Sequence, residues 1–181
     1  MFWTRTLTGL AACILLSCAA QAAELKLFQD KGEGVAFQYP GDWRLQPKTK
    51  GSIATLFAPD GKASLILPEN ISVASQPMLP DMDLAAYTRL NENQLSGETG
   101  AELLESKPVD IGGIPGHSMV TTGSYNAREV KFLTAWTIRN GKAYVLSYGA
   151  LKENYDKMAD DAKKVLASLK FIDGKEKKSG N

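Results

Sequence analysis

One dipeptide, His117-Ser118, brings together the two side-chain types that form a nucleophile and its base. A serine hydroxyl becomes nucleophilic when a histidine within hydrogen-bonding reach accepts its proton. The dipeptide lies in a turn rich in glycine and proline, just before a predicted strand. Neighbouring residues of a strand point to opposite faces, so these two side chains cannot make that contact. We therefore interpret His117, the only histidine of the chain, as a loop residue that forms a hydrogen bond or faces solvent.

The segment from Gly112 to Gly116 has three glycines, the residue type that lets backbone N–H groups approach a phosphate. A phosphate-binding loop needs a strand before it and a helix after it, and neither is predicted here. Pro115 also lacks the backbone N–H group that such a loop would use. We therefore predict a plain loop.

Two carboxylate pairs, Asp81-x-Asp83 and Asp160-Asp161, suggest metal binding at first sight. Neither pair has the alternating oxygen ligands and the glycine of a calcium-binding loop. Helix capping explains the first pair, and the solvated face of a helix explains the second. The sequence therefore predicts no metal or cofactor site.

Six aromatic residues are spaced as they would be in strands, where they can either fill the core or line a ligand groove. Core packing is the interpretation that we favour. They are Phe37, Tyr39, Trp43, Trp136, Tyr144 and Tyr148. No spacing picks out a serine–lysine pair or a carboxylate pair for hydrolysis, so no catalytic residue is predicted and the chain is not expected to be an enzyme.

The first 22 residues have the pattern of a secretory signal peptide. Met1–Arg5 carries one positive charge, and the apolar stretch Leu7–Leu16 is too short to span a bilayer. Small residues at positions 20 and 22 predict cleavage between Ala22 and Ala23. The segment that ends at Cys18 also resembles a lipobox, which would make Cys18 a lipidated N-terminus. We favour soluble export, because the cleavage site at Ala22 is the cleaner match, and we expect membrane attachment only if Cys18 is lipidated.

The charge balance and the cysteine content exclude further classes of function. Lys and Arg together number 21 and Asp and Glu number 20, so no basic excess predicts binding to nucleic acid. Both cysteines, Cys13 and Cys18, lie in or beside the signal. The exported domain therefore has no disulfide and no thiol chemistry, and it must be stabilised by its apolar core. We expect a periplasmic location.

Hydrophobic periodicity predicts strands followed by a helix, further strands and a final helix. Strands are predicted at 35–39, 53–57, 63–67, 71–73, 103–109, 118–122, 130–139 and 142–150. Hairpins are predicted at Asp60-Gly61 and Asn140-Gly141. The first helix should begin at an N-cap formed by Asp83 and end at Gly97. In the final helix an apolar stripe that includes Leu166 should pack on the sheet, against Trp136 or its neighbours.

Several stretches, in this order, resemble the PsbP-like domain, which is shared by Ran-binding Mog proteins and bacterial DcrB-type exported proteins. The stretches that carry the resemblance are Val35–Trp43, Asn70–Val73, Leu84–Tyr87, Gly141–Tyr148 and Leu166–Phe171. The resemblance implies an α+β fold, an α/β/α sandwich on a largely antiparallel sheet, and members that are mostly adaptors or extrinsic subunits. The resemblance rests on the order and spacing of these stretches, since none of them is a catalytic motif.

We therefore expect a signal peptide at 1–22, a lead-in at 23–34, a PsbP-like domain at 35–171 and a disordered polar tail at 172–181. The expected function is that of an exported, non-enzymatic binding or adaptor protein, whose partner is another envelope protein. The alternative is a periplasmic domain that binds a small ligand or a divalent metal ion in a concave site. The shape of the surface beside the sheet should discriminate between these functions.

Overall fold

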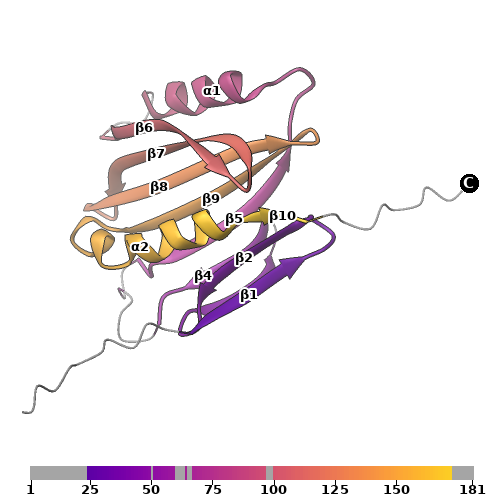
Figure 1. Cartoon of the computed structure of the whole chain (residues 1–181). Coiled ribbons are helices and arrows are strands. Elements are labelled where there is room, and N and C mark those ends of the chain that lie inside the picture. The colour runs from indigo at the N-terminus through magenta and orange to yellow at the C-terminus, as the bar shows by residue number, and fades with distance from the viewer. Residues whose placement is uncertain (1–23, 50, 60–63, 65–66, 97–99, 173–181) are drawn as a thin grey trace, which may run out of the picture.

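The computed structural model describes residues 24–49, 51–59, 64, 67–96 and 100–172 (Figure 1). Within these residues the chain forms two antiparallel sheets and two helices. The strands are β1 (Leu25–Asp30), β2 (Val35–Pro40), β3 (Arg44–Thr49), β4 (Ser52–Phe57), β5 (Asn70–Pro77), β6 (Glu102–Ile111), β7 (Ile114–Tyr125), β8 (Arg128–Arg139), β9 (Lys142–Leu151) and β10 (Lys170–Phe171). The helices are α1 (Leu84–Ser96) and α2 (Lys152–Ser168).

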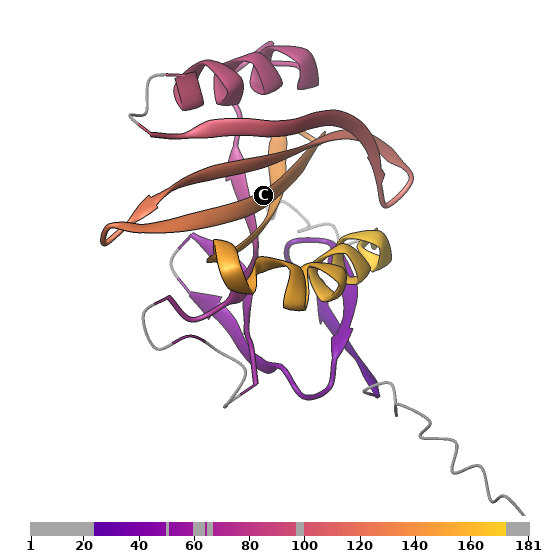
Figure 2. The same ribbon diagram turned by 90° about the vertical axis from the view of Figure 1, so that its left-hand side faces the viewer.

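The large sheet has the strand order β3-β4-β5-β9-β8-β7-β6, and the small sheet has the order β1-β2-β10. One face of the large sheet carries α1, near β6 and β7. The opposite face carries α2, with the small sheet beside it (Figures 1 and 2). The fold is therefore the α/β/α arrangement on a largely antiparallel sheet that the resemblance implied.

Alternation along β8 assigns its side chains to the two faces. Leu133 and Ala135 belong to the core that α2 covers, whereas Trp136 lies in a second cluster with Tyr87 of α1. The indole N–H of Trp136 donates to Thr88 Oγ1 over 3.1 Å. Only the neighbours of Trp136 therefore share the core of α2. The prediction that the final helix packs against Trp136 or its neighbours is confirmed for the neighbours, because successive strand residues point to opposite faces.

Two hairpin turns use left-handed backbone conformations. Asn140 and Gly141 have φ values of 50° and 69°, which confirms the predicted turn. Gly112 and Gly113 have φ values of 65° and 83° and also form a tight turn, so β7 begins at Ile114. The prediction of a loop as far as Gly116 is therefore wrong. Gly116 lies inside β7, where a Cβ atom would approach the carbonyl oxygen of Trp136 to 2.6 Å.

Both predicted helices form. The Asp83 side chain accepts a hydrogen bond of 2.7 Å from the N–H of Ala86, which confirms the N-cap of α1. Gly97, the predicted end of α1, lies outside the described residues. On α2 the apolar stripe is buried except at Leu166, which is half-buried and packs at the edge of the core. The fully or nearly buried members are Tyr155, Met158, Ala159, Ala162 and Val165.

At its two ends the domain extends beyond the predicted limits. The expected lead-in at 23–34 contains β1, which pairs with β2 from Leu25 opposite Pro40 to Asp30 opposite Val35. The N–H of Ile172 donates to the carbonyl of Gly34 over 2.9 Å, so this residue still contacts the small sheet. The predicted signal peptide, most of the tail and the predicted turn at Asp60-Gly61 lie outside the described residues.

Candidate functional site

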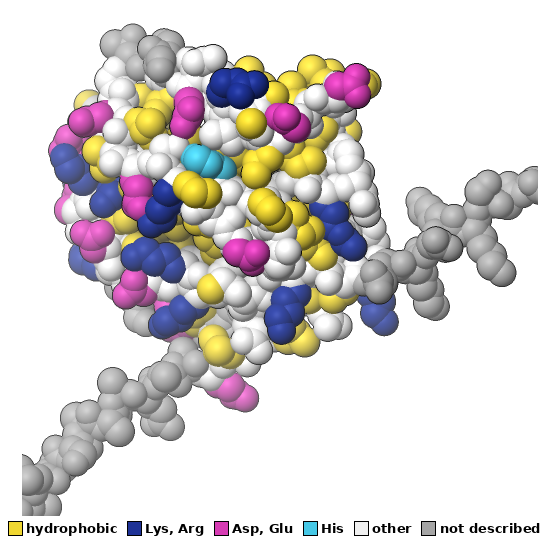
Figure 3. All heavy atoms as spheres, turned by 45° about the horizontal axis from the view of Figure 1, so that its top comes forward, with side chains coloured by type: hydrophobic (Ala, Val, Ile, Leu, Met, Phe, Trp, Pro, Cys, Tyr) yellow, Lys and Arg dark blue, Asp and Glu magenta, His cyan; other side chains and the backbone are white. Residues whose placement is uncertain are grey.

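His117 lies within β7 and not in a loop, contrary to the prediction. It pairs across the strands with Trp136, and its ring lies 5.5 Å from the indole. Ser118 points to the other face and is buried. The two neighbours are therefore kept apart, as strand geometry requires. Figure 3 shows the side chain of His117, in cyan, at the surface of the molecule.

A different serine reaches His117. Ser106 Oγ on β6 lies 2.7 Å from His117 Nε2 and donates to Glu92 Oε1 of α1, also over 2.7 Å. A hydroxyl has one proton, so a serine that donates to Glu92 can only accept a hydrogen bond from His117. A serine nucleophile needs the reverse polarity, with the histidine accepting its proton. This arrangement therefore ties α1 to β6 and β7 and does not activate a nucleophile.

The predicted carboxylate pairs have structural roles. Asp83 caps α1, and Asp160 pairs with Lys163 at 3.2 Å on the exposed side of α2. Asp161 accepts a hydrogen bond of 3.2 Å from the indole N–H of Trp43. Within the described part of the chain, no three His, Cys, Asp or Glu side chains are grouped as a metal site would need. The structure therefore gives these carboxylates no metal-binding arrangement.

The aromatic side chains fill the core. Phe37 stacks on Phe28 with 4.9 Å between ring centroids. The hydroxyl of Tyr148 donates to the carbonyl of Tyr155 over 2.9 Å. Burial raises the pKa of both tyrosines, that of Tyr155 to about 12, because the charged phenolate is poorly solvated there. These rings support the fold, and two of the predicted aromatic residues, Phe37 and Trp136, also border concave surfaces.

A polar cluster joins the turn between β1 and β2 to the large sheet. Glu33 Oε2 accepts hydrogen bonds from Ser75 Oγ at 2.8 Å and from Lys142 Nζ at 3.1 Å. The hydrogen bond from Ser75, followed by that from Lys142, lowers the pKa of Glu33, and the Glu33 carboxylate raises the pKa of Lys142. Tyr144 also donates to the Glu33 carbonyl over 3.1 Å. The cluster satisfies its own polar groups, which favours a structural role.

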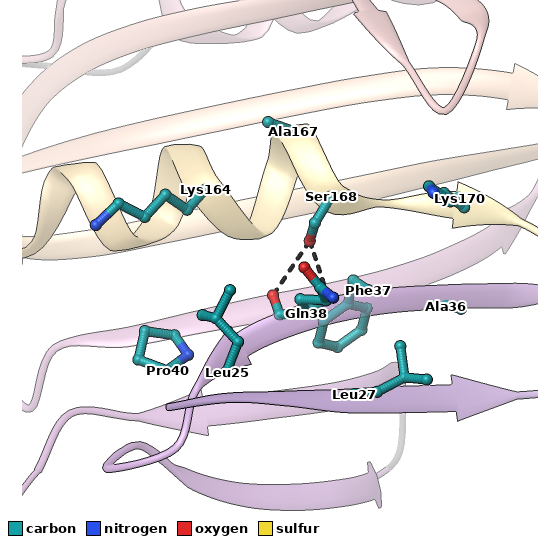
Figure 4. A pocket seen from close by; sticks show the side chains of 10 residues that line it. All are labelled: Leu25, Leu27, Ala36, Phe37, Gln38, Pro40, Lys164, Ala167, Ser168 and Lys170. Carbon is teal, nitrogen blue, oxygen red and sulfur yellow. Dashed lines mark hydrogen bonds between the residues drawn. The ribbon is translucent and has the colours of Figure 1, made fainter. Parts of the chain in front are cut away.

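The main concave surface is an open groove of about 500 Å³ between the small sheet and the C-terminal half of α2 (Figure 4). We call it the β1–α2 groove. Its lining residues are Leu25, Leu27, Ala36, Phe37, Gln38, Pro40, Lys164, Ala167, Ser168 and Lys170. Most of the lining is apolar, so the groove offers hydrophobic contact with a few polar groups.

Strand alternation on β1 creates the apolar wall of the groove. Phe28 points into the core, so Leu25 and Leu27 point to the opposite face, where they are 53% and 60% exposed. In Figure 4 both leucines extend from β1 toward α2. Neither residue was predicted as a site residue, because no strand was predicted at 25–30. Their alternation with Phe28 was the available signal.

The floor of the groove is closed by hydrogen bonds. The N–H of Gln38 on β2 donates to Ser168 Oγ over 2.8 Å, and the same hydroxyl lies 3.2 Å from the Gln38 carbonyl. Ser168 thus continues the pairing that β10 makes with Ala36 and Val35. The edge of β2 is therefore already paired, so a bound molecule would contact side chains in the groove.

Cationic side chains stand at the two ends of the groove. Lys164 lies at the end near Leu25 and Pro40, and Lys170 lies at the opposite end (Figure 4). Lys164 Nζ is 3.6 Å from Asp161 Oδ1, so part of its charge is neutralised. For Lys170, which is exposed, the described residues provide no ion pair. Of the two lysines that line the groove, Lys170 is therefore the one whose charge is not neutralised by a described carboxylate.

Cys18, Ala22 and Ala23, the residues of the two alternative processing sites, lie outside the described residues. Neither α1 nor α2, the helices in the described part of the chain, combines the length and the apolar character that a membrane span requires. The groove lies at Leu25, close to the point where the described chain begins.

Comparison with known proteins gives one family and several structures. A family model described as PsbP matches residues 23–171. LpqN of Mycobacterium tuberculosis, described as involved in cell envelope biogenesis, superposes with a TM-score of 0.62 at 17% identity, covering 76% of this chain and 83% of LpqN. CyanoP, the PsbP of Synechocystis, gives a TM-score of 0.59 at 20% identity, covering 87% of this chain and 99% of CyanoP.

A third structure, PA94 of Pseudomonas aeruginosa, is described as a protein of unknown function and a putative regulator. It gives a TM-score of 0.54 at 14% identity, covering 78% of this chain and 92% of PA94. None of the curated proteins matches this chain in sequence. At these identities the three structures establish the fold.

Proposed function

Because this chain belongs to the PsbP family, we propose that it is an exported, non-enzymatic binding protein of the bacterial cell envelope that engages another envelope protein. The β1–α2 groove is the observation that carries the proposal. Its exposed Leu25 and Leu27 form an apolar wall on the surface, a feature that marks sites of interaction when it is contiguous. The signal-like sequence at 1–22 supports export, and the likeness to LpqN supports a role in the envelope.

Two observations support a non-enzymatic role. Ser106, the one serine that the hydrogen bonds place beside His117, has the wrong polarity for a nucleophile, because it donates to Glu92. The groove itself is lined mostly by leucine, alanine, phenylalanine and proline, with lysines at its ends, and the hydroxyl of Ser168 is engaged by backbone carbonyls. Such a surface provides binding energy but holds no general acid–base pair.

Site-specific photocrosslinking in living cells tests the proposal. A photoreactive amino acid at Leu27 is expected to capture one envelope protein repeatedly, because Leu27 lies in the groove. The matched control is the same substitution at Leu90, an exposed leucine on α1, which is 41% exposed. Capture of the same protein from both positions, or of none from Leu27, would contradict a partner at the groove.

Mass spectrometry of the mature N-terminus tests export. A chain that begins at Ala23 is expected, and a lipid-modified chain that begins at Cys18 would replace soluble export with membrane attachment. An unprocessed chain beginning at Met1 in the cytoplasm would contradict export altogether.

A second candidate function is the binding of a small ligand in the periplasm. It is favoured by the volume of the groove, about 500 Å³, which lies within the range of about 300 to 1,000 Å³ typical of ligand sites. A thermal-shift screen of metabolites and divalent ions would detect it, since a ligand at a hundred times its Kd stabilises the fold by about 2.7 kcal/mol. A flat response across the screen would remove this candidate.

A further inference from the structure

The two sides of the β1–α2 groove differ in chemistry. The side formed by β1 and β2 presents Leu25, Leu27 and Pro40, and the backbone N–H and carbonyl of Gln38 in its floor are paired with Ser168. A peptide lying in the groove would find no free backbone group of β2 to pair with, since β1 covers one edge and β10 with Ser168 covers the other. The groove therefore suits a molecule that binds through apolar contact along its length.

The two lysines of the groove differ in how far their charge is neutralised. Lys170 pairs across the strands with Ala36, so it points to the same face of the small sheet as the groove. At the other end, Lys164 is partly neutralised by Asp161, 3.6 Å away. An apolar channel with one unneutralised cation at its end is complementary to a molecule with an apolar tail and a single anionic group.

We infer that the β1–α2 groove binds a monomeric amphiphile that has one acyl chain and an anionic head group, either a carboxylate or a phosphate. The head group lies at Lys170, and the chain runs over Leu27 and Leu25 toward Pro40. The strand rises about 3.3 Å per residue, so this path along β2 is about 13 Å long and suits a chain of medium length. The inference rests on the second candidate function, the binding of a small ligand in this groove, and names the chemical class of that ligand.

Calorimetric titration with three ten-carbon probes tests the inference: decanoate, decyl phosphate and decyltrimethylammonium, each kept below its micelle concentration. Saturable one-to-one binding is expected for both anions. The cation has the same chain and the opposite charge, so its affinity should be at least about fivefold lower, the effect of losing one exposed charge contact. Binding of decanoate alone would identify a free fatty acid as the ligand class, and binding of decyl phosphate alone would identify a phosphate head group.

Two substitutions in the groove separate the charge from the apolar contact. Lys170→Gln should weaken both anions about fivefold and should not weaken the cation, because it also removes a like-charge repulsion. Leu27→Asp should weaken all three probes at least about tenfold, because it places a charge in the path of the chain. The matched controls are Lys107→Gln on β6 and Leu90→Asp on α1, both exposed and remote from the groove, and they should leave all affinities unchanged. Circular dichroism should show that all four variants are folded.

Four outcomes would overturn the inference: no binding of either anion, equal binding of the cation, equal effects of the groove and control substitutions, or binding only to vesicles of phosphatidylglycerol. The last result would mean that the surface recognises a membrane and not a monomer. Capture of a protein through Leu27 in cells, together with no anion binding, would remove this inference and leave the proposed function intact. If no protein is captured through Leu27 and no anion binds, both the inference and the proposed function are contradicted.

Discussion

The two helices lie on opposite faces of the same sheet but are attached to it in different ways. α2 buries five side chains in the main core, whereas α1 buries only Tyr87 and Thr88 and packs its half-buried Leu84 and Leu95 on a smaller cluster. Three hydrogen bonds also hold α1, between Trp136 and Thr88, between Gln76 and Tyr87, and between Ser106 and Glu92.

This difference indicates which side of the sheet contributes more to the stability of the fold and which side offers a binding surface. On the α1 face, the polar groups named above pair with one another, and Leu90 of α1 and Phe132 of β8 are also partly exposed. On the α2 face, the side of the helix that faces the core is saturated with apolar contacts, while the adjacent groove leaves Leu25 and Leu27 exposed. We therefore expect the α2 side to carry both the larger share of stability and the binding site.

The largest expected effect compares apolar truncations on the two helices. Met158→Ala on α2 should lower the free energy of unfolding by about 2–5 kcal/mol, because the side chain is 5% exposed and leaves a cavity. Leu95→Ala on α1 should cost less than about 1.5 kcal/mol, because Leu95 is only half-buried. Urea denaturation measures both. Equal losses would contradict the difference between the helices.

Leu166→Ala refines this comparison. A fully buried leucine would predict a loss of about 2–5 kcal/mol, but Leu166 packs at the edge of the core. Its cost in the same urea experiment should therefore lie between those of Met158→Ala and Leu95→Ala. A loss as large as that of Met158→Ala would place this turn of α2 deeper in the core than the structure does.

The next effect concerns a polar anchor of α2. Glu69 is fully buried and accepts hydrogen bonds from the N–H of Ser64 at 2.7 Å and from Asn154 Nδ2 at 3.0 Å. Glu69→Ala should cost about 1–3 kcal/mol, because buried donors lose their acceptor. On the α1 face, Ser106→Ala removes exposed hydrogen bonds and should cost less than about 1 kcal/mol. A larger loss at Ser106 than at Glu69 would reverse the comparison.

A pH-dependent effect is expected on the α2 side alone at high pH. The pKa of Tyr155 is raised to about 12 and that of Tyr148 is raised further, from ordinary values of 10.0. The unfolded chain loses these protons first, so the stabilisation is present below pH 10 and is lost as the pH rises toward 12 and beyond. Stability at pH 9 and pH 11, with tyrosinate absorbance, measures this. Tyr148→Phe and Tyr155→Phe should each flatten the decline, and an unchanged decline in both would contradict the assignment.

The smallest effect serves as a reference. Lys163 lies on the exposed side of α2 and pairs with Asp160 at 3.2 Å. Lys163→Ala should change the free energy of unfolding by less than about 0.5 kcal/mol, because exposed ion pairs contribute little. Thermal melts at low and high salt would reveal any larger contribution. A loss that approaches that of Met158→Ala would show that the outer face of α2 is not solvated as the structure has it.

Local sequence was sufficient for the elements whose signals lie within a few residues. The N-cap at Asp83, the turn at Asn140-Gly141 and the apolar stripe of α2 were all predictable. Each depends on a backbone preference or on a spacing of three and four residues, so no distant contact is needed to specify it. The order of these elements was also sufficient to indicate the family.

Local signals failed where short segments are completed by distant ones. The strand at Leu25–Asp30 has only a brief alternation of its own and becomes a strand by pairing with β2. His117 was assigned to a loop because glycine and proline precede it. The turn, however, closes at Gly113, and pairing with β6 and β8 makes the following residues a strand.

The composition, the signal-like pattern at 1–22 and the strands and helices with local signals could therefore be read from the sequence. Only the folded chain brings Ser106 to His117 and Glu69 to Asn154, and places the leucines of β1 and Lys170 along one groove. This difference follows from the distance along the chain over which each kind of interaction acts. Backbone preferences act between neighbours in the chain, whereas the β1–α2 groove joins Leu25 to Lys170 through packing and sheet pairing across more than a hundred residues.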